Sequence, residues 1–185
     1  MKKYSYKNRG MWLEHIINDS NTFYINKDKA IIYKKPTPIK VLDVSYPTRK
    51  TTVINKAVFE SISTLDYNGI YKGKYIEFDA KECKGKTSFP LSNIKNHQIE
   101  HIKNILRHKG IVFLIIFMNN NFFLLKGEDL INFINNNTRK SMPYNFIDTV
   151  GHKIKEKYNP RLDYLEVIDK IYFEEEWKWL IKLEE

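Results

Sequence analysis

The first clear pattern of hydrophobic and polar positions along the chain is helical. In residues 9–26 (RGMWLEHIINDSNTFYIN), Leu13, Ile16 and Ile17 fall on one face of a 3.6-residue repeat, and Glu14 lies off that face. This spacing predicts a helix that packs one side against a core. Residues 1–10, which overlap the start of this segment, are interpreted as a short basic arm.

Strand patterns follow this helix. Residues 29–35 (KAIIYKK) predict a strand that stops at the Pro-Thr-Pro run 36–38. Residues 63–82 (STLDYNGIYKGKYIEFDAKE) predict a turn and a β-hairpin, in which Gly69 and Gly73 act as breakers.

The second half of the chain also predicts both strands and helices. Residues 111–117 (IVFLIIF) are apolar on both faces, which is typical of a central strand buried on both sides, and residues 122–126 (FFLLK) supply its hairpin partner. Residues 127–137 predict a short helix, and the acidic, amphipathic residues 174–185 predict another. Residues 92–110 predict a helix with Gly110 as its C-cap and with these side chains inward: Ile94, Ile99, Ile102, Ile105 and Leu106.

Residues 39–62 differ in character, because β-branched and charged residues alternate there, Pro47 interrupts the run, and few positions could join a core. We expect a protruding, partly extended arm. Helices that flank a mixed sheet place the chain in the α/β class. We expect one domain over residues 1–173, with the arm as an insertion and residues 174–185 as a tail.

The charge of the chain points to a class of partner. The 31 Lys and Arg against 22 Asp and Glu give a formal net charge of +9, which favours nucleic acid before membrane, although biased genome composition also explains a Lys-rich chain. The single Cys83 fits a reducing compartment. The longest apolar run, 111–118, is shorter than the roughly 20 residues that span a bilayer. The basic N-terminus has no apolar segment after it, so we expect no signal peptide and a cytoplasmic protein.

Candidate chemistry concentrates on residues 75–82 (YIEFDAKE). Side chains of a strand alternate between its faces, so Glu77, Asp79 and Lys81 share one face. The plain explanation is a half-buried strand with a solvated polar face. Three observations favour a site. Asp79 and Lys81 stand about 6.6 Å apart, a span that a phosphate with its metal ion can bridge. Asp66 can reach Asp79 across the hairpin, and clustered acids are unexpected in a basic chain. Mg²⁺ takes one or two carboxylates together with water and phosphate oxygens.

An Asp followed by Asp/Glu-x-Lys on a strand is the motif of the PD-(D/E)xK nucleases, and alone it is weak because it is short. Further stretches give it context: NRGMWLE, KKPTPIKV, DVSYPTRK, STLDYNGIYKGKYIEFDAKE, KTSFPLSNIKNHQIEH and PRLDYLEVIDKIYF. From about Asn8 to Phe173 the chain resembles the RecU family of Holliday junction resolvases. The resemblance implies a restriction-endonuclease-like fold. It also implies a homodimeric, Mg²⁺-dependent endonuclease that cuts four-way DNA junctions by paired symmetric nicks in recombination and repair. Mn²⁺ is a possible substitute ion, and a RecA-type recombinase a possible partner.

The resemblance also assigns roles to single residues. Asp66 and Asp79 match the family's metal-binding carboxylates, Thr64 and Gln98 match its remaining metal-site positions, and Lys81 matches the lysine that stabilises the transition state. The chemistry agrees, because phosphodiester hydrolysis needs a metal to polarise the phosphate and positive charge near the developing anion. A turn hydroxyl is the plain alternative for Thr64, and an exposed helix residue is the plain alternative for Gln98.

Two features depart from the family pattern. The family usually has Asp at position 77 and Glu at position 79, so the two acids are exchanged here, and the shorter Asp79 would bring a metal closer to the strand or bind it less tightly. The N-terminal arm is shorter than the family's basic tail. Glu14 is interpreted as an ordinary exposed helix residue, with a place near the site as the alternative.

In the family, the segment that matches residues 39–62 is a stalk that projects from the dimer into the junction. Phosphate contacts position DNA without specifying its sequence, so we expect recognition of junction shape. The candidate DNA contacts are Arg9, Tyr46, Arg49, Lys50, Lys56, Lys72 and Lys74, with Lys84 and Lys86 as further phosphate contacts. An ordinary solvated charge is the plain alternative for any one lysine. His97 and His101 lack a third ligand and are interpreted as surface or DNA-facing, and Cys83 as a small neighbour of the site.

Two other functions stay open at this stage. A protein that binds DNA junctions and modulates a recombinase, with cleavage weakened or lost through the acid exchange, would keep the basic arm. A restriction-type nuclease would share the motif but leave the arm unexplained. Metal-dependent cleavage would distinguish a resolvase from a junction-binding modulator. A preference for substrate shape over sequence would distinguish a resolvase from a restriction-type nuclease.

Overall fold

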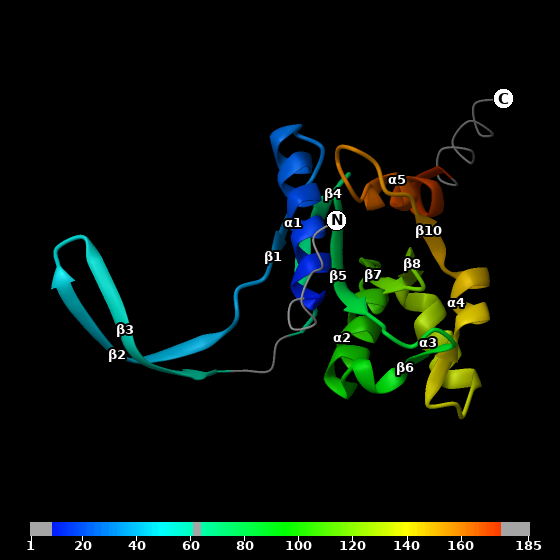
Figure 1. The fold of residues 1–185 in the computed structure, drawn as a ribbon, viewed down its shortest axis with the longest axis horizontal. Helices are drawn as coiled ribbons and strands as arrows, with labels where there is room; N and C mark the ends of the chain where they lie inside the picture. Colours follow the sequence, from blue (N-terminus) through cyan, green and yellow to red (C-terminus); the bar gives the residue numbers. More distant parts are fainter. Residues whose placement is uncertain (1–8, 61–63, 175–185) are drawn as a thin grey trace.

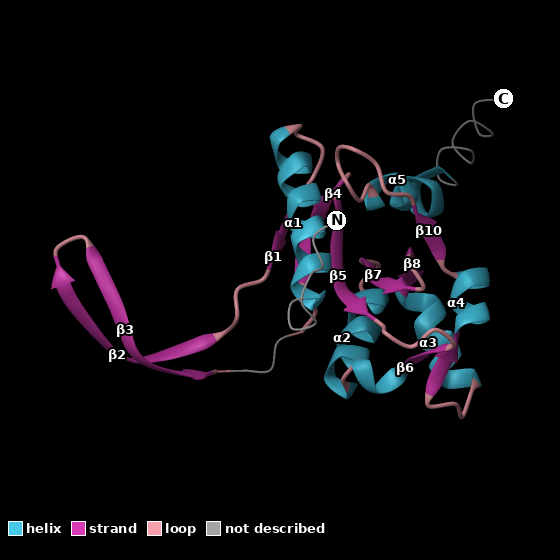
Figure 2. Ribbon diagram, viewed as in Figure 1, coloured by secondary structure: helices cyan, strands magenta, loops and turns pink. Residues whose placement is uncertain are grey.

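A six-stranded mixed sheet forms the centre of the computed structural model, which describes residues 9–60 and 64–174 (Figures 1 and 2). The strand order is β1-β4-β5-β7-β8-β10; β5 and β7 are parallel, and every other neighbouring pair in this sheet is antiparallel. Its strands are β1 (Ile31–Lys34), β4 (Tyr67–Tyr71), β5 (Lys74–Glu82), β7 (Ile111–Met118), β8 (Asn121–Lys126) and β10 (His152–Ile154). The α/β class and the mixed sheet predicted from the sequence are confirmed.

Helices cover both faces of the sheet and close two hydrophobic cores (Figure 2). Helices α1 (Arg9–Asn26) and α5 (Tyr164–Ile168), which leads into the helical turn η3 (Asp169–Phe173), belong to one core. Helices α2 (Asn96–Arg107), α3 (Gly127–Asn136) and α4 (Tyr144–Val150) belong to the other. The small pair β6 (Ser88–Pro90) and β9 (Ser141–Pro143) lies beside them, with the helical turn η2 (Leu91–Asn93) between β6 and α2.

Strand β7 is buried on both of its faces. Its residues alternate between the two cores: Phe113 and Ile115 belong to the core under α1, and Val112 and Leu114 to the core under α2. All four are at most 1% exposed, so the prediction of a central strand buried on both sides is confirmed. The helical pattern of α1 is confirmed too, because Leu13, Ile16 and Ile17 are buried.

The end of α2 differs from the prediction. Gly110 is not the residue in the left-handed conformation; Lys109 is, with φ of 59°. The amides of Lys109 and Gly110 donate to the carbonyls of Leu106 and Ile105, which satisfies the last turn of the helix. A glycine is still required at 110, because a Cβ there would lie 2.7 Å from the Ile105 side chain. Ile94, expected inside the helix, is buried but precedes it.

Gly69 was expected to break the hairpin, and this prediction was wrong. It lies inside β4, paired with Ile32 of β1 and Ile76 of β5. A Cβ on Gly69 would lie 2.0 Å from the Ile31 carbonyl oxygen, so only glycine lets the edge strand approach. Gly73 does form the turn, with φ of 73°.

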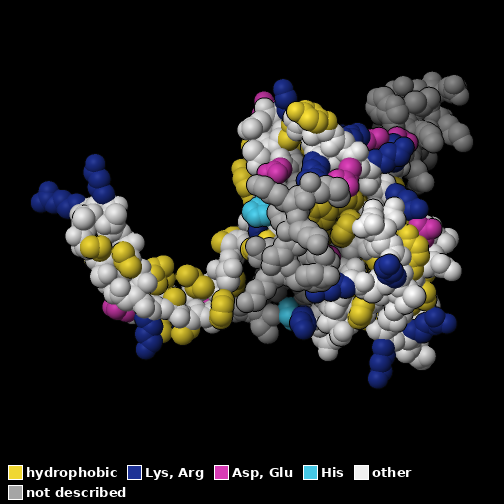
Figure 3. Space-filling model, in the orientation of Figure 1, with side chains coloured by type: hydrophobic (Ala, Val, Ile, Leu, Met, Phe, Trp, Pro, Cys, Tyr) yellow, Lys and Arg dark blue, Asp and Glu magenta, His cyan; other side chains and the backbone are white. Residues whose placement is uncertain are grey.

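Residues 39–59 form a long hairpin that extends away from the sheet, as the arm prediction requires (Figure 1). Its strands β2 (Ile39–Thr48) and β3 (Thr51–Phe59) pair with each other in a two-stranded sheet, and nearly every residue is exposed. Basic side chains gather at its tip (Figure 3). This hairpin is called the stalk below.

Three expectations fall largely outside the described residues: the basic arm at 1–8, the last residues of the 39–62 segment and the helical tail at 175–185. Within the part of the chain that the structure describes, no helix is both long and apolar enough to cross a bilayer.

Candidate functional site

The β4–β5 hairpin brings Asp66 and Asp79 together. Tyr67 pairs with Phe78, so the residue before β4 stands beside the residue after Phe78 on β5. Burial of Asp66 and the charge of the neighbouring Asp79 raise the pKa of Asp66 to about 6. Two carboxylates that repel one another in a partly buried place form a site that favours a cation.

Asp79 is the buried member of this pair. Its residue is 0% exposed, its Oδ2 lies 2.7 Å from Lys81 Nζ, and the same oxygen accepts a hydrogen bond of 2.8 Å from Gln98 Nε2. Its other oxygen, Oδ1, is buried and has no hydrogen-bond partner among the described residues. The plain explanation of a solvated polar face was therefore wrong here, since Gln98 on α2 lies over this face of β5.

Gln98 connects α2 to the segment before β4. Its Nε2 also donates to the carbonyl oxygen of Thr64 at 3.0 Å, and its Oε1 accepts from the Lys95 amide at 3.1 Å. The amide thus presents its nitrogen, not its oxygen, to Asp79. The structure brings together all four positions expected at the metal site, Thr64, Asp66, Asp79 and Gln98, with Lys81 beside them.

The donor set fits a hard divalent cation. Among the described residues, no three side chains of the His, Cys, Asp and Glu types are grouped so that they could hold a metal ion. Two carboxylates with nearby oxygens are nevertheless what Mg²⁺ uses when substrate phosphate and water complete its shell. The unpartnered Oδ1 of Asp79 is an oxygen that a cation could satisfy.

Glu77 has a different environment from Asp79, although both point to the same face of β5. It is 1% exposed and accepts hydrogen bonds from Lys35 Nζ, from the Tyr75 hydroxyl at 2.6 Å and from His101 Nε2 at 2.9 Å. Burial alone would raise the pKa of Glu77, but these hydrogen bonds outweigh it and hold the pKa below its ordinary value. His101, expected at the surface or facing DNA, contacts Glu77 and has a side chain that is 28% exposed.

Sequence reasoning missed Lys35 altogether. It lies 42 residues from Glu77 along the chain, and no local spacing marks it.

Glu14 lies nearer the site than an ordinary exposed helix residue would: it is ion-paired with Lys34 at the end of β1. Burial and the charges of Glu14, Asp66 and Asp79, in this order, raise the pKa of the buried Tyr67.

The candidate DNA contacts fall into separate groups. Arg49 and Lys50 form the turn of the stalk, Tyr46 on β2 is 71% exposed, and Lys56 lies on β3. Lys72 and Lys74 lie at the β4–β5 turn, the opposite end of the hairpin from Asp66 and Asp79. Lys72 is ion-paired with Asp169 at 2.6 Å and lies over the Phe173 ring. Arg9 begins α1, but its side chain is outside the described part.

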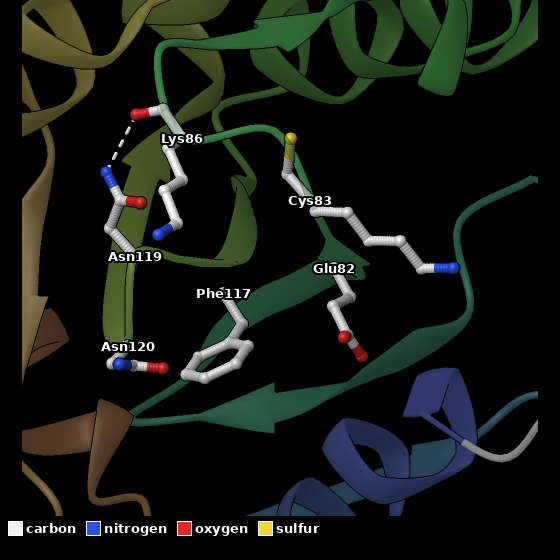
Figure 4. Close-up of a pocket in the computed structure, with 7 residues that line it drawn as sticks. Glu82, Cys83, Lys86, Phe117, Asn119 and Asn120 are labelled. Carbon is white, nitrogen blue, oxygen red and sulfur yellow. Dashed lines mark hydrogen bonds between the residues drawn. The ribbon is translucent and has the colours of Figure 1, made fainter. Parts of the chain in front are cut away.

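A cavity of about 400 Å³ opens just beyond the site, at the end of β5 (Figure 4). Glu82, Lys84 and Lys86 line it. Asn119 lies beside Lys86 and donates to the Lys86 carbonyl at 2.8 Å (Figure 4). Cys83 also lines the cavity, is buried, and directs its thiol to the Ser88 carbonyl at 3.5 Å. The sulfur is thus a small packed neighbour, as expected.

Comparisons with known proteins place the chain in a family. Residues 8–170 match the family model of RecU, recombination protein U. The Holliday junction resolvase RecU of Bacillus mycoides is 47% identical over 178 residues, which cover 94% of this chain and 89% of that protein. The Holliday junction resolvase RecU of Shouchella clausii is 44% identical over 172 residues, 91% of this chain and 83% of that protein.

Among solved structures, Hjc, a Holliday junction resolvase from Archaeoglobus fulgidus, aligns over 77% of this chain and 94% of its own, with a TM-score of 0.46 and 10% identity. The family match spans the stalk and every residue of the Asp66–Asp79 site. Its extent, and the 44–47% identity of these relatives over more than nine tenths of the chain, show that the chain belongs to the RecU family of recombination proteins.

Proposed function

We propose that this protein is a structure-specific endonuclease that resolves four-way (Holliday) DNA junctions in recombination and DNA repair by hydrolysing phosphodiester bonds. The observation that carries the proposal is the arrangement of Asp66, Asp79 and Lys81: two adjoining carboxylates, one with an unpartnered buried oxygen, beside an ammonium 2.7 Å from the other oxygen. Relatives that bear the name Holliday junction resolvase at 44–47% identity support it.

Asp66 and Asp79 would hold a divalent cation, Mg²⁺ with Mn²⁺ as a substitute, and Thr64 and Gln98 would complete its surroundings. When bound, the ion would polarise the phosphate and favour ionisation of a water. Gln98 fixes the Asp79 carboxylate through its Nε2 and leaves Oδ1 free. Of the two exchanged acids, Glu77 is engaged by Lys35, Tyr75 and His101, whereas Asp79 keeps an oxygen that could bind the ion. A junction-binding modulator without cleavage is therefore the weaker candidate.

Lys81 supplies the remaining charge. Its Nζ is held by Asp79 and its side chain is 20% exposed, so it is fixed yet within reach of a DNA phosphate. As the attacking oxygen adds to phosphorus, negative charge grows on the non-bridging oxygens, and a pre-positioned ammonium stabilises that charge without further reorganisation. Asp66 and Asp79 would hold the ion, and Lys81 would stabilise charge on the phosphate.

The stalk would bind the junction. Arg49 and Lys50 at its turn, with Tyr46 and Lys56 along its length, suit contacts to the DNA backbone, which position DNA without specifying sequence. Paired symmetric nicks require two sites related by a twofold axis, so the working unit is a homodimer. A single nuclease domain over 1–173 with the stalk inserted at 39–62, a cytoplasmic location and a RecA-type recombinase as partner complete the proposal.

A cleavage assay tests the function. A labelled four-way junction and a linear duplex of the same arm sequence are incubated with the protein in Mg²⁺, in Mn²⁺ and in EDTA, beside Asp66→Asn. Paired nicks in the junction alone, absent in EDTA and in the variant, are expected. Asp148→Asn makes the same change at an exposed residue of α4 and should cut like the wild type. Tight junction binding without cleavage in either metal would establish the modulator instead. A monomer at micromolar concentration in light scattering would refute the dimer.

A further inference from the structure

The two ends of the stalk meet at one buried carboxylate. The chain leaves β1 through Lys35 and enters β2, and after β3 it returns through Thr64 and Leu65 to Asp66 and β4. Lys35 and Thr64 are therefore the residues at which the stalk joins the nuclease centre. Both lie within hydrogen-bond distance of each other, and Lys35 reaches Glu77.

Lys35 makes three connections. Its backbone amide donates to the carbonyl oxygen of Asp66 at 2.7 Å, and its Nζ donates to Thr64 Oγ1 at 2.7 Å and to Glu77 Oε1. The amide of Leu65 points to the same Glu77 oxygen, at 3.4 Å. Lys35, Thr64 and Glu77 are called the stalk clamp below. The clamp holds the segment that carries Asp66 from both sides.

Glu77 is anchored in the rigid part of the protein. It lies on β5, and its two oxygens also accept from Tyr75 on the same strand and from His101 on α2. Oε1 thus faces Lys35, His101 and the Leu65 amide, and Oε2 faces the Tyr75 hydroxyl. Unlike Asp79, which has an unpartnered oxygen, Glu77 has both oxygens engaged. It is suited to hold protein groups in place rather than to bind an ion.

The charges in this region explain why such a clamp is needed. Asp66 stands beside Asp79, and Glu77 lies two residues from Asp79 on the same face of β5. Lys81 pairs with Asp79 and Lys35 pairs with Glu77, whereas the positive charges of Lys81 and Lys34 act on Asp66 without an ion pair to it among the described residues. Because Asp79 repels Asp66, the backbone of Asp66 must be restrained to keep the two carboxylates together.

We propose that Lys35 and Glu77 are positioning residues for cleavage: they fix Asp66 beside Asp79 and tie this arrangement to the base of the stalk. The inference rests on the proposed function. DNA bound along the stalk is then cut only while the clamp holds Asp66 in place. Loss of the clamp slows the chemical step and leaves the DNA-binding residues of the stalk intact.

Kinetics at saturation separate these effects. Glu77→Gln, Lys35→Met and the double variant are compared with wild type in single-turnover cleavage of a junction in Mg²⁺, and junction affinity is measured without divalent metal. We expect each single variant to cleave at least tenfold more slowly with a Kd within twofold of wild type. The double variant should be no slower than the slower single variant, because both changes break one unit. Glu77→Asp keeps the charge and should recover part of the rate.

Lys153→Met is the matched control, because it removes a lysine–carboxylate ion pair of 2.7 Å with Asp148, and Lys153 lies on β10 at the far edge of the sheet. It should cleave at the wild-type rate. A clamp variant that cleaves as fast as wild type, or that loses affinity but not rate, would overturn the proposal.

Hydrogen exchange gives a readout that does not depend on activity. Amides of residues 65–67 should exchange at least tenfold faster in both single variants, while amides of β7 stay as protected as in wild type. Unchanged exchange at 65–67 would overturn the clamp. General loss of protection in Glu77→Gln would mean that the buried charge holds the fold. In that case the cleavage rate and the hydrogen exchange of Lys35→Met test the clamp, because the Lys35 side chain is 23% exposed and its replacement leaves the buried Glu77 in place. A wild-type protein that cuts no junction would overturn the proposed function instead, and exchange would still test the clamp.

Discussion

Replacing Asp66 with Asn should stabilise the metal-free protein while abolishing its activity. In the folded chain the Asp66 carboxyl is partly buried and faces Asp79, and its pKa of about 6 compares with an ordinary value of 3.8. Above pH 6 Asp66 is ionised, and its charge is unfavourable beside Asp79. Asn has nearly the same shape, carries no charge, and can donate its amide to Asp79. Active sites often hold such strained charge at the expense of stability.

The structure sets the size of the effect. A pKa raised by about two units corresponds to roughly 3 kcal/mol at 1.36 kcal/mol per unit. Because Asp66 is partly exposed, solvent screens much of this, and we expect a gain of about 1 kcal/mol. For a chain of this length that raises Tm by about 2–4 °C. Since the folded pKa lies above the unfolded one, wild type loses stability as the pH rises from about 4 through 6. The gain of Asp66→Asn should thus be absent near pH 4 and complete above about pH 7.

Urea unfolding followed by circular dichroism checks this, in EDTA at pH 4.5 and 7.5, with Asp148→Asn as the control. Addition of Mg²⁺ at pH 7.5 should reverse the order, because only wild type gains stability from binding the ion. A variant that is less stable than wild type at pH 7.5 in EDTA, or equally stabilised at both pH values, would refute the repulsion between Asp66 and Asp79.

Three further predictions follow from other parts of the molecule. Lys50→Ala, at the stalk turn, should weaken junction binding and reduce the slope of log K against log salt by about 1; an unchanged slope in a salt titration would exclude a phosphate contact. Gly69→Ala should lower the free energy of unfolding in urea by about 3 kcal/mol, because its Cβ would lie 2.0 Å from the Ile31 carbonyl oxygen. Gly73→Ala has open space around it and should lower the free energy of unfolding by only about 1 kcal/mol, through its positive φ. Equal losses for the two variants would contradict this. Affinity for Mg²⁺ or Mn²⁺, measured by calorimetry, should fall as the pH drops through about 6, since a proton on Asp66 competes with the ion; constant affinity from pH 7.5 to 5 would argue against binding there.

Features fixed by neighbouring residues could be predicted from the sequence. The apolar run of β7 and the one-sided pattern of α1 identify their elements, because period and burial are set within a few turns or pleats. The stalk could be predicted because residues 39–59 contain too few core positions to be buried. The approach of Asp66 to Asp79 also needed only a tight hairpin.

Features that depend on packing between distant segments could not be predicted. Lys35 reaches Glu77 only because β1 pairs with β4, and His101 reaches it only because α2 lies on β5. Gly69 was taken as a breaker on the basis of glycine's own flexibility, whereas the reason for it lies in the backbone of a strand 38 residues earlier. The burial of Glu77 and Asp79 has the same origin, because alternation shows that the two share a face but not what covers it.

The parallel pairing of β5 with β7 has a consequence for the newly made chain. Asp66 and Asp79 sit on a local hairpin, but Asp79 is flanked by Leu114 only after the long crossover through α2 has docked. An isolated hairpin is marginally stable in water, and non-local pairings of this kind form late in folding. A nascent or partly unfolded copy therefore has both carboxylates without Gln98 or the strand that completes their surroundings. Such a copy lacks the complete set of neighbours that the proposed cleavage requires, so the site forms only with the whole sheet.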